Sequence, residues 1–361
     1  MSRLRSLHSS ELRHAKIVIR VPNWIGDAVM TLPALRALRA ALPEAEVTLL
    51  ARPWVRDVYP LSELHFTVLD YDSQTTHGGI KGRLKIVNEL KKQRFDLALL
   101  FQNAFDAALI AWMARIPIRA GYGRDGRHFL LTHSVDVPQP GEIPAHESHY
   151  YLELLRRLGL IPTYEQVREI SLRPSLPGDG PSSDLRRRLR EMGASEKLDK
   201  IIGLSPGASF GTAKRWPADR FADLVKKLDS ELNATCVLFG SSQEARLAEE
   251  IVEKSHARAF SLAGKTNLAM FTNLVSGCNV YVTNDTGTMH VAAALGVPTV
   301  AIFGPTDERG TAPLGPSVEI VLGVADCRPC KLRHCPYGHH NCMVSISPDM
   351  VMNRIRQSLG D

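Results

Sequence analysis

The order of apolar and polar residues constrains the fold of this chain more than any other feature, because one succession of segments occurs twice. Residues 16–21 (KIVIRV) are a short apolar run, followed by the glycine-containing loop PNWIG and a helical pattern that begins at Asp27. A second series starts at 201–205 with an apolar run, a loop of small residues and a helix start at Pro217. Apolar runs that alternate with helices are typical of a parallel sheet covered by helices on both faces. The sequence therefore predicts an α/β fold with two Rossmann-like, doubly wound domains.

The same periodicity predicts further elements. Strands are expected at 47–51, 66–69, 96–101 and 235–239, and a basic amphipathic helix at 80–93. Residues 172–184 (LRPSLPGDGPSSD) are dense in proline, glycine and serine, which is typical of a linker. The predicted domains are therefore 1–171 and 185–361, joined by this linker. In such folds ligands bind at the carboxyl ends of the strands.

Charge and hydropathy limit where the protein works. Apolar residues make up 44% of the chain and the net charge is +6, an ordinary balance for a globular protein. The most apolar stretch, 97–118, is interrupted by polar residues and is not a membrane span, and the basic first fifteen residues lack the apolar core of a secretory signal. We therefore expect a cytoplasmic protein. Basic clusters in the first half suit an anionic partner or membrane face, although a solvated surface explains them equally well; they are Arg3-Arg5-Arg13-His14-Lys16, Lys81-Arg83-Lys85, Lys91-Lys92-Arg94 and Arg119-Arg124-Arg127.

The segment 279–294 (NVYVTNDTGTMHVAAA) carries the clearest functional signal. An apolar strand ends at Thr283, and a helix of small residues follows Asp285. Asp285 has the side chain of a helix N-cap, while Thr286 and Gly287 offer backbone N–H groups at the positive end of the helix. Simple capping would explain Asp285 alone but not the whole polar cluster with His290 one turn further on. We interpret the turn as a phosphate-binding site.

A second loop, 205–217 (SPGASFGTAKRWP), follows the first strand of the second domain. Its hydroxyl groups, its glycines and Lys214 suit contact with phosphate, but the order of residues is not that of a Walker A loop. Glu244 follows the next strand, where Rossmann-type domains place an acid that binds ribose. It would equally serve as an ordinary first-turn residue of a helix.

In the first domain, Asp27 follows Gly26 at the turn from strand to helix. Helix capping would explain this carboxylate on its own, but at a ligand-binding edge it could act as a general base. We expect acceptor contacts from the same loop, at Asn23 and Trp24, and from the basic loop at Arg124 and Arg127. The latter loop spells G-x-G-x-x-G at 121–126, but a strand-like run at 128–135 follows it and not a helix, so it is no dinucleotide fingerprint.

The carboxyl-terminal part contains four cysteines within sixteen residues: Cys327, Cys330, Cys335 and Cys342. Their number would suit a small structural zinc site, but the spacing is short for paired zinc knuckles. Thiols without metal are equally compatible. We expect a local fold element in this Cys-rich segment, 327–342, and not a catalytic centre.

Several separated segments, spread over nearly the whole chain, resemble the ADP-heptose:lipopolysaccharide heptosyltransferases, glycosyltransferase family nine. They are RVPNWIGDAVMTLPALRALR, SPGASFGTAKRWP, FGSSQE and TNDTGTMHVAAALGVPTVAIFGPTD. The tail CRPCKLRHCPYGHHNCM resembles the heptosyltransferase II branch. The resemblance implies a GT-B fold, in which two Rossmann-like domains face a central cleft, the first binding the acceptor and the second the ADP-sugar.

The resemblance also implies a reaction. It would be an inverting transfer of L-glycero-D-manno-heptose from ADP-heptose to heptosyl-Kdo2-lipid A, the phosphorylated lipid acceptor at the inner membrane surface, with no cofactor and no catalytic metal. Asp27 would be the general base, Lys214 would neutralise the diphosphate, Thr286 and Gly287 would bind it, and Glu244 would bind the ribose. Ser209 would lie near the phosphate, although Phe210 beside it departs from the polar residue expected there.

Alternative functions differ in substrate or in class. A heptosyltransferase I, or another GT-B sugar-nucleotide enzyme such as an epimerase, would share most of these motifs. A nucleic-acid-binding protein would use the cysteines as a finger and the basic clusters as its footprint. We expect no nucleic-acid partner.

Overall fold

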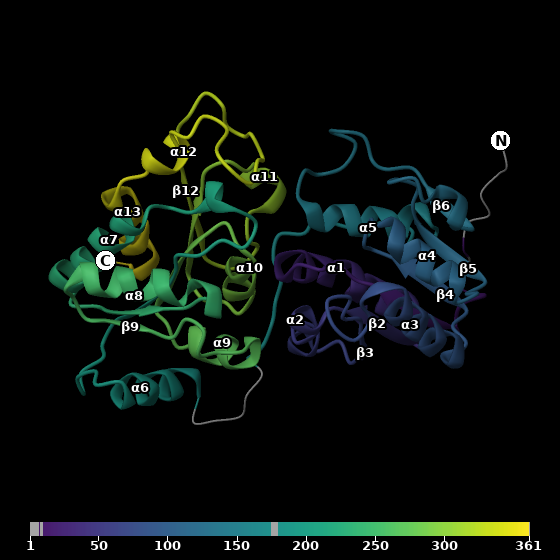
Figure 1. The fold of residues 1–361 in the computed structure, drawn as a ribbon, viewed down its shortest axis with the longest axis horizontal. Helices are drawn as coiled ribbons and strands as arrows, with labels where there is room; N and C mark the ends of the chain where they lie inside the picture. Colours follow the sequence, from purple (N-terminus) through teal and green to yellow (C-terminus); the bar gives the residue numbers. More distant parts are fainter. Residues whose placement is uncertain (1–6, 8–9, 175–179, 361) are drawn as a thin grey trace. The chain divides into compact units, whose positions relative to one another are not determined.

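The structure, a computed structural model, describes residue 7 and residues 10–174 and 180–360. The chain forms two compact units, Met1–Val167 and Arg168–Asp361 (Figure 1). Several residues used in the sequence predictions lie outside the described residues. They are Arg3 and Arg5 of the first basic cluster, most of the first fifteen residues, which lack the features of a secretory signal, and residues 175–179 of the predicted linker. Among the described residues, no helix is long and apolar enough to cross a membrane.

The boundary between the units differs from the predicted linker at 172–184. The backbone N–H groups of Ile170 and Leu172 donate to Leu314 O and Ala294 O, so these residues are already held by the second unit. At the other end of the predicted linker, Pro181 begins helix α6 (Pro181–Glu191). Proline at the first position of a helix is common because its fixed φ suits the helix and its missing N–H has no partner there anyway. Pro181, one of the prolines that suggested a linker, is therefore a helix start.

The first unit is built on one six-stranded parallel sheet in the order β3-β2-β1-β4-β5-β6. Its strands are β1 (Lys16–Arg20), β2 (Glu46–Ala51), β3 (Thr67–Asp70), β4 (Leu97–Leu100), β5 (Ile118–Tyr122) and β6 (His133–Val135). The strand-like run expected at 128–135 is a single 3-10 turn, His128–Leu130, followed by the short β6.

Helices cover both faces of this sheet. They are α1 (Ile25–Ala41), α2 (Pro53–Arg56), α3 (Gly79–Gln93), α4 (Phe105–Met113) and α5 (Glu147–Arg157). Val18 packs in a core with Ile86 and Val87 of α3 and Ala108 of α4, whereas α1 and α5 contact each other. Successive strand residues point to opposite faces, and Ile17, Val18 and Ile19 are all buried, so this strand requires helices on both sides.

The second unit repeats the plan with its own parallel sheet, in the order β12-β11-β10-β7-β8-β9. Its strands are β7 (Ile201–Ser205), β8 (Thr235–Leu238), β9 (Ala259–Ser261), β10 (Val280–Asn284), β11 (Thr299–Phe303) and β12 (Val318–Leu322). After α6 its helices are α7 (Ala218–Leu232), α8 (Ala245–Ser255), α9 (Leu268–Val275), α10 (Gly287–Ala294), α11 (Glu308–Thr311), α12 (Asn341–Val344) and α13 (Pro348–Leu359).

Both sheets have the doubly wound strand order. The first strand lies in the middle, the next two strands extend the sheet to one edge, and the last three extend it to the other edge. The direction of winding reverses between β1 and β4 in the first unit, and between β7 and β10 in the second. At such a point the loops after the two strands turn to opposite faces and leave a crevice at the carboxyl edge, where ligands bind. The predicted α/β fold with two Rossmann-like units is confirmed.

Candidate functional site

In the second unit, Asn284 organises the carboxyl edge at the point where winding reverses. It is the last residue of β10 and is fully buried. Its side-chain amide donates to Pro206 O at 2.7 Å, and its Oδ1 accepts from Trp216 N at 3.2 Å. One side chain therefore fixes both ends of the loop that follows β7, the loop that carries Ser209 and Lys214.

Asp285 and Lys214 form an ion pair at this edge. Lys214 Nζ lies 2.6 Å from Asp285 Oδ2, and Thr306 Oγ1 donates to the same oxygen at 2.6 Å. Both charged side chains are largely buried. The sequence predicted Asp285 as the N-cap of α10, but Thr286 holds that position. The lysine and the Thr306 hydroxyl engage the carboxylate, which therefore holds Lys214 in place.

The start of α10 has the form expected of an anion-binding turn. Thr286 is the N-cap, Gly287 is the first helical residue, and the Thr286 and Thr288 hydroxyls lie 2.7 Å apart. The Thr286 side chain makes no capping hydrogen bond, so the N–H groups at the helix start and the Thr286 hydroxyl are groups that the turn can present to a ligand. His290, predicted to contact the donor, is buried one turn further along α10.

Glu244 lies against the same loop. Its Oε2 accepts from Ser241 N and Ser241 Oγ at 2.7 and 2.8 Å, which forms a capping box before α8. A Cβ on Gly207 would lie 1.7 Å from Glu244 Oε1, so a larger residue there would displace the Glu244 carboxylate from its present position. The predicted helix-start role of Glu244 is therefore observed, and its other oxygen lies beside the loop that carries Lys214. Ser209 is exposed on that loop.

In the first unit, Asp27 lies in the first turn of α1, directly after β1. The N-cap is Trp24, so capping does not explain this carboxylate. Asp27 is half-buried. Burial raises the pKa of Tyr59 and of Tyr151, and the nearby charge of Asp27 raises both further. The carboxylate is therefore close enough to two buried phenols to act on them electrostatically.

Asn23 is held by arginines that the sequence did not single out. Its Oδ1 accepts from Arg20 at 2.6 Å and from Arg52 Nε at 3.3 Å, and its carbonyl accepts from Trp54 Nε1 at 2.8 Å. Burial, followed by the charge of Arg52, lowers the pKa of Arg20 to about 10. Trp24 beside it is half exposed. A charged residue at the end of an apolar strand, as at Arg20 in KIVIR, was the signal that could have revealed this cluster.

Arg124 and Arg127 differ, although both were predicted to contact the acceptor. Arg127 is fully buried, and its guanidinium donates to Tyr122 O, to Gln102 O and, at 2.8 Å, to Asn103 Oδ1. Burial lowers its pKa to about 10. It joins the ends of β4 and β5 from inside, so direct contact with an acceptor is not the role its surroundings give it. Arg124 is exposed, and a hydrogen bond with Tyr150 raises its pKa.

The four clustered cysteines differ in burial. Cys342 is buried and the other three are partly exposed. Burial raises the pKa of the Cys342 thiol, and the thiols of Cys327, Cys330 and Cys335 raise it further. Within the described part of the chain, no three His, Cys, Asp or Glu side chains are placed to hold one metal ion. We therefore derive no step or role through zinc.

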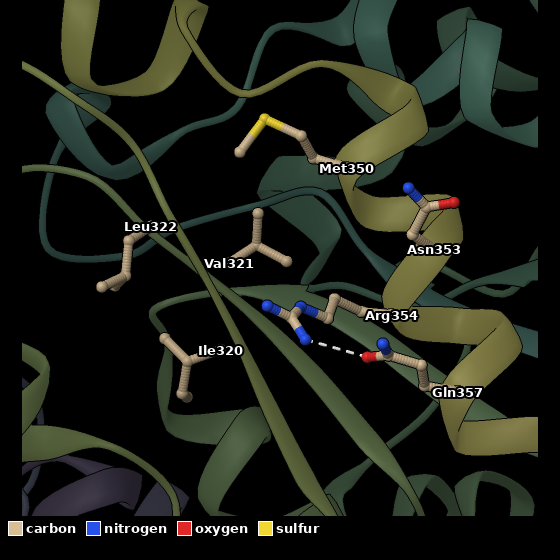
Figure 2. A pocket seen from close by; sticks show the side chains of 7 residues that line it. All are labelled: Ile320, Val321, Leu322, Met350, Asn353, Arg354 and Gln357. Atoms are coloured by element: carbon tan, nitrogen blue, oxygen red, sulfur yellow. Dashed lines mark hydrogen bonds between the residues drawn. The ribbon is translucent and has the colours of Figure 1, made fainter.

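A pocket elsewhere on the second unit lies between β12 and α13 (Figure 2). Its one charged side chain, Arg354, is hydrogen-bonded to Gln357 at 2.9 Å and lies 3.5 Å from Glu319. None of the predicted site residues lines this pocket. The chemistry at the carboxyl edges of the two sheets is therefore the better candidate.

Two Rossmann-like units, one of which carries a lysine and a glycine-containing helix start at the point of reversal, are the arrangement expected of sugar-nucleotide enzymes of the GT-B class. Comparison with known proteins agrees with this assignment. Residues 83–341 match the family described as Glycosyltransferase family 9 (heptosyltransferase). The chain belongs to this family, and its activity is heptose transfer in the synthesis of the lipopolysaccharide core.

The relatives match over nearly their whole length. Lipopolysaccharide heptosyltransferase 2 of Escherichia coli is 31% identical over 351 residues, which cover 95% of this chain and 98% of that protein. Lipooligosaccharide heptosyltransferase 2 of Haemophilus ducreyi is 30% identical, with 95% and 99% covered. Among solved structures, the ADP-heptose lipopolysaccharide heptosyltransferase II of E. coli matches with a TM-score of 0.77 and 28% identity, over 95% of this chain and 98% of that one.

Proposed function

We propose that this enzyme transfers L-glycero-D-manno-heptose from ADP-heptose to heptosyl-Kdo2-lipid A, the acceptor that already carries one heptose. The observation that carries the proposal is the full-length similarity to heptosyltransferase 2 proteins. The ion pair and helix start at the carboxyl edge of the second sheet support it, because they suit the diphosphate of the donor. The comparisons give no support to a nucleic-acid-binding protein.

In the proposed reaction, Asp27 takes the proton from the acceptor hydroxyl. The hydroxyl oxygen attacks the anomeric carbon of heptose from the face opposite ADP. The bond from that carbon to the phosphate oxygen breaks, so the configuration inverts and ADP leaves. The position of Asp27 after β1, half-buried in the first turn of α1 and not at its N-cap, supports its assignment as the base.

The departing diphosphate gains charge as the bond breaks. Lys214 and the N–H groups at Gly287 would stabilise this charge, together with the Thr286 hydroxyl. Asp285 acts as a positioning residue, because it holds Lys214 at 2.6 Å. Glu244 would bind the ribose through the oxygen that faces Gly207. We propose that these groups replace a catalytic metal ion and that no cofactor takes part.

The lipid acceptor gives the enzyme a reason to bind a membrane surface. Lys81 and Lys85 of α3 and Lys91 and Lys92 near its end are among the basic residues of the first unit. Such residues are attracted to anionic headgroups by about 1 kcal/mol each. We propose a peripheral position at the inner face of the cytoplasmic membrane.

The deciding experiment is an assay with ADP-heptose and two acceptors, Kdo2-lipid A with no heptose or with one. We expect transfer only to the acceptor that carries one heptose, and an undiminished rate in EDTA. Transfer only to the heptose-free acceptor would establish heptosyltransferase I activity in its place. Absence of transfer to both, with turnover of another sugar nucleotide, would refute the proposal.

A further inference from the structure

The cysteine-rich segment, Cys327–Cys342, is anchored at its start to the loop that follows β11. Arg328 Nε donates to Gly304 O at 2.6 Å, and its Nη2 pairs with Glu308 Oε2 at 2.5 Å. Lys331 N donates to Pro305 O at 2.8 Å. These contacts hold the segment beside Thr306, whose hydroxyl donates to Asp285.

Two residues beyond Lys331, the segment contacts the loop that follows β7. Ala213 N donates to Arg333 O at 3.1 Å, and the Thr212 hydroxyl lies 3.1 Å from His334 Nδ1. A Cβ on Gly211 would lie 2.2 Å from Arg333 O, so the two backbones touch. Because β10 lies between β7 and β11 in the sheet, the segment spans the carboxyl end of β10, where the Asp285–Gly287 turn begins.

Phe210 joins this segment to the candidate donor site. Its ring centroid is 4.9 Å from Lys214 Nζ and 5.0 Å from Arg333 Cζ. A cation near an aromatic ring is attracted by the electrons of its face, which restricts where the cation can lie. Phe210, which seemed out of place in a phosphate-binding loop, therefore positions two cations near the turn of α10.

Charge shows why a second cation is needed. Lys214 is paired with Asp285 at 2.6 Å, and together the pair has no net charge. A nucleoside diphosphate is strongly anionic, and a neutral pair offers it little net attraction. The Arg333 side chain is exposed, so its guanidinium can reach a ligand. A guanidinium also presents a planar fork of donors that matches two phosphate oxygens.

We propose that Arg333 binds the diphosphate of the sugar-nucleotide donor together with Lys214, and that the cysteine-rich segment is the arm that brings it there. The inference rests on the proposed function and adds a donor-binding residue to it. It also gives the segment a role that requires no metal ion.

The test compares Arg333→Ala and Arg333→Lys with the unmodified enzyme. ADP and adenosine are the probes, because they differ only in the diphosphate. Hydrogen bonds to charged groups contribute about 1.5–3 kcal/mol, so Arg333→Ala should weaken ADP binding roughly 10- to 100-fold. Adenosine binding should not change, and Arg333→Lys should recover part of the loss. In Arg333→Ala the KM for ADP-heptose should rise together with the dissociation constant of ADP. Arg354→Ala, on α13, removes the same charge at another place and should leave ADP binding unchanged.

Unchanged ADP affinity in Arg333→Ala would overturn the inference, as would an equal loss for adenosine, which would indicate a general disturbance of the site. The proposed function fails in a different way. If the unmodified enzyme binds ADP, loses this affinity on Arg333→Ala, and yet transfers no heptose to either acceptor, then Arg333 still binds a diphosphate and only the assigned reaction is wrong.

Discussion

The two sheets have the same strand order, but residues of different kinds form their carboxyl edges. In the second unit, Gly207 and Gly211 let backbone and carboxylate approach closely, and the cation Lys214 is held by a buried aspartate. In the first unit, the edge is filled by arginines whose guanidinium groups donate to backbone carbonyls and to amide side chains, as Arg20 and Arg127 do.

This difference suggests two kinds of substrate recognition. Glycine turns and a helix start present fixed backbone donors, which suit one compact group such as a diphosphate. A framework of buried arginines holds loops in shape and leaves recognition to a few exposed residues, such as Trp24 and Arg124. We propose that the first edge binds the larger acceptor, through the loops that this framework supports.

The strongest test of the comparison is Asp27→Asn, which removes the proposed base from the first edge without changing its size. We expect kcat to fall about 10²- to 10⁴-fold, while ADP binding at the second edge stays as it was. Steady-state kinetics with an ADP titration would measure both. The matched control is Asp57→Asn, which should keep full activity. Asp57 carries an exposed carboxylate at the end of α2 that pairs with Arg56. A normal rate in Asp27→Asn would remove its role as the base.

Arg127→Ala and Arg124→Ala test whether the first edge divides into framework and contact residues. Loss of the buried Arg127 guanidinium removes the hydrogen bonds that Gln102 O and Asn103 Oδ1 accept from it, so we expect a loss of about 3 kcal/mol in the free energy of unfolding. The exposed Arg124 should cost about 0.5 kcal/mol or less, while its loss raises KM for the acceptor. Urea unfolding and acceptor kinetics would show this division. Equal destabilisation by the two variants would contradict it.

Lys214→Ala addresses the second edge, where we expect the smallest of these effects. KM for ADP-heptose should rise roughly tenfold, because one charged contact with the diphosphate is lost. Asp285 would then be buried with only the Thr306 hydroxyl as its partner, so the unit should also lose about 1–3 kcal/mol of stability. The double variant with Asp285→Ala separates the two effects. It should regain stability but not donor affinity, measured by thermal unfolding and ADP titration. Recovered donor affinity in the double variant would show that Lys214 serves only the ion pair.

The predicted strands agree closely with the structure where the pattern is local. Strand β7 (Ile201–Ser205) has the predicted bounds, and α3 (Gly79–Gln93) differs by one residue. A short, mainly apolar run such as IIGLS, bounded by a glycine-containing loop, is typical of a strand in a sheet covered on both faces, so the local sequence is sufficient to predict it. The loops at the carboxyl ends of β1, β7 and β10 follow from the same pattern, and with them the positions of Asp27, Lys214 and Thr286.

Functional partners across loops could not be predicted in this way. Asn284 bonds to the backbone of Trp216, which is 68 residues distant in the chain. Asp285 has the side chain of a cap, yet Lys214 and Thr306 engage it, and Thr286 holds the N-cap position. A carboxylate can satisfy either role, and which one it takes depends on the cation that the neighbouring loop supplies.

The sequence by itself determined two parallel α/β units and the turns that could bind a diphosphate, because hydrophobic period and turn chemistry are properties of adjacent residues. The residues that contact those turns depend on the tertiary structure. Strand order brings β7, β10 and β11 side by side, and only this adjacency places Arg333 of the cysteine-rich segment at the ring of Phe210. The tertiary structure of the first unit likewise explains why Arg127, predicted to contact the acceptor, is buried. Burial of an arginine depends on carbonyl groups from strands far apart in the chain.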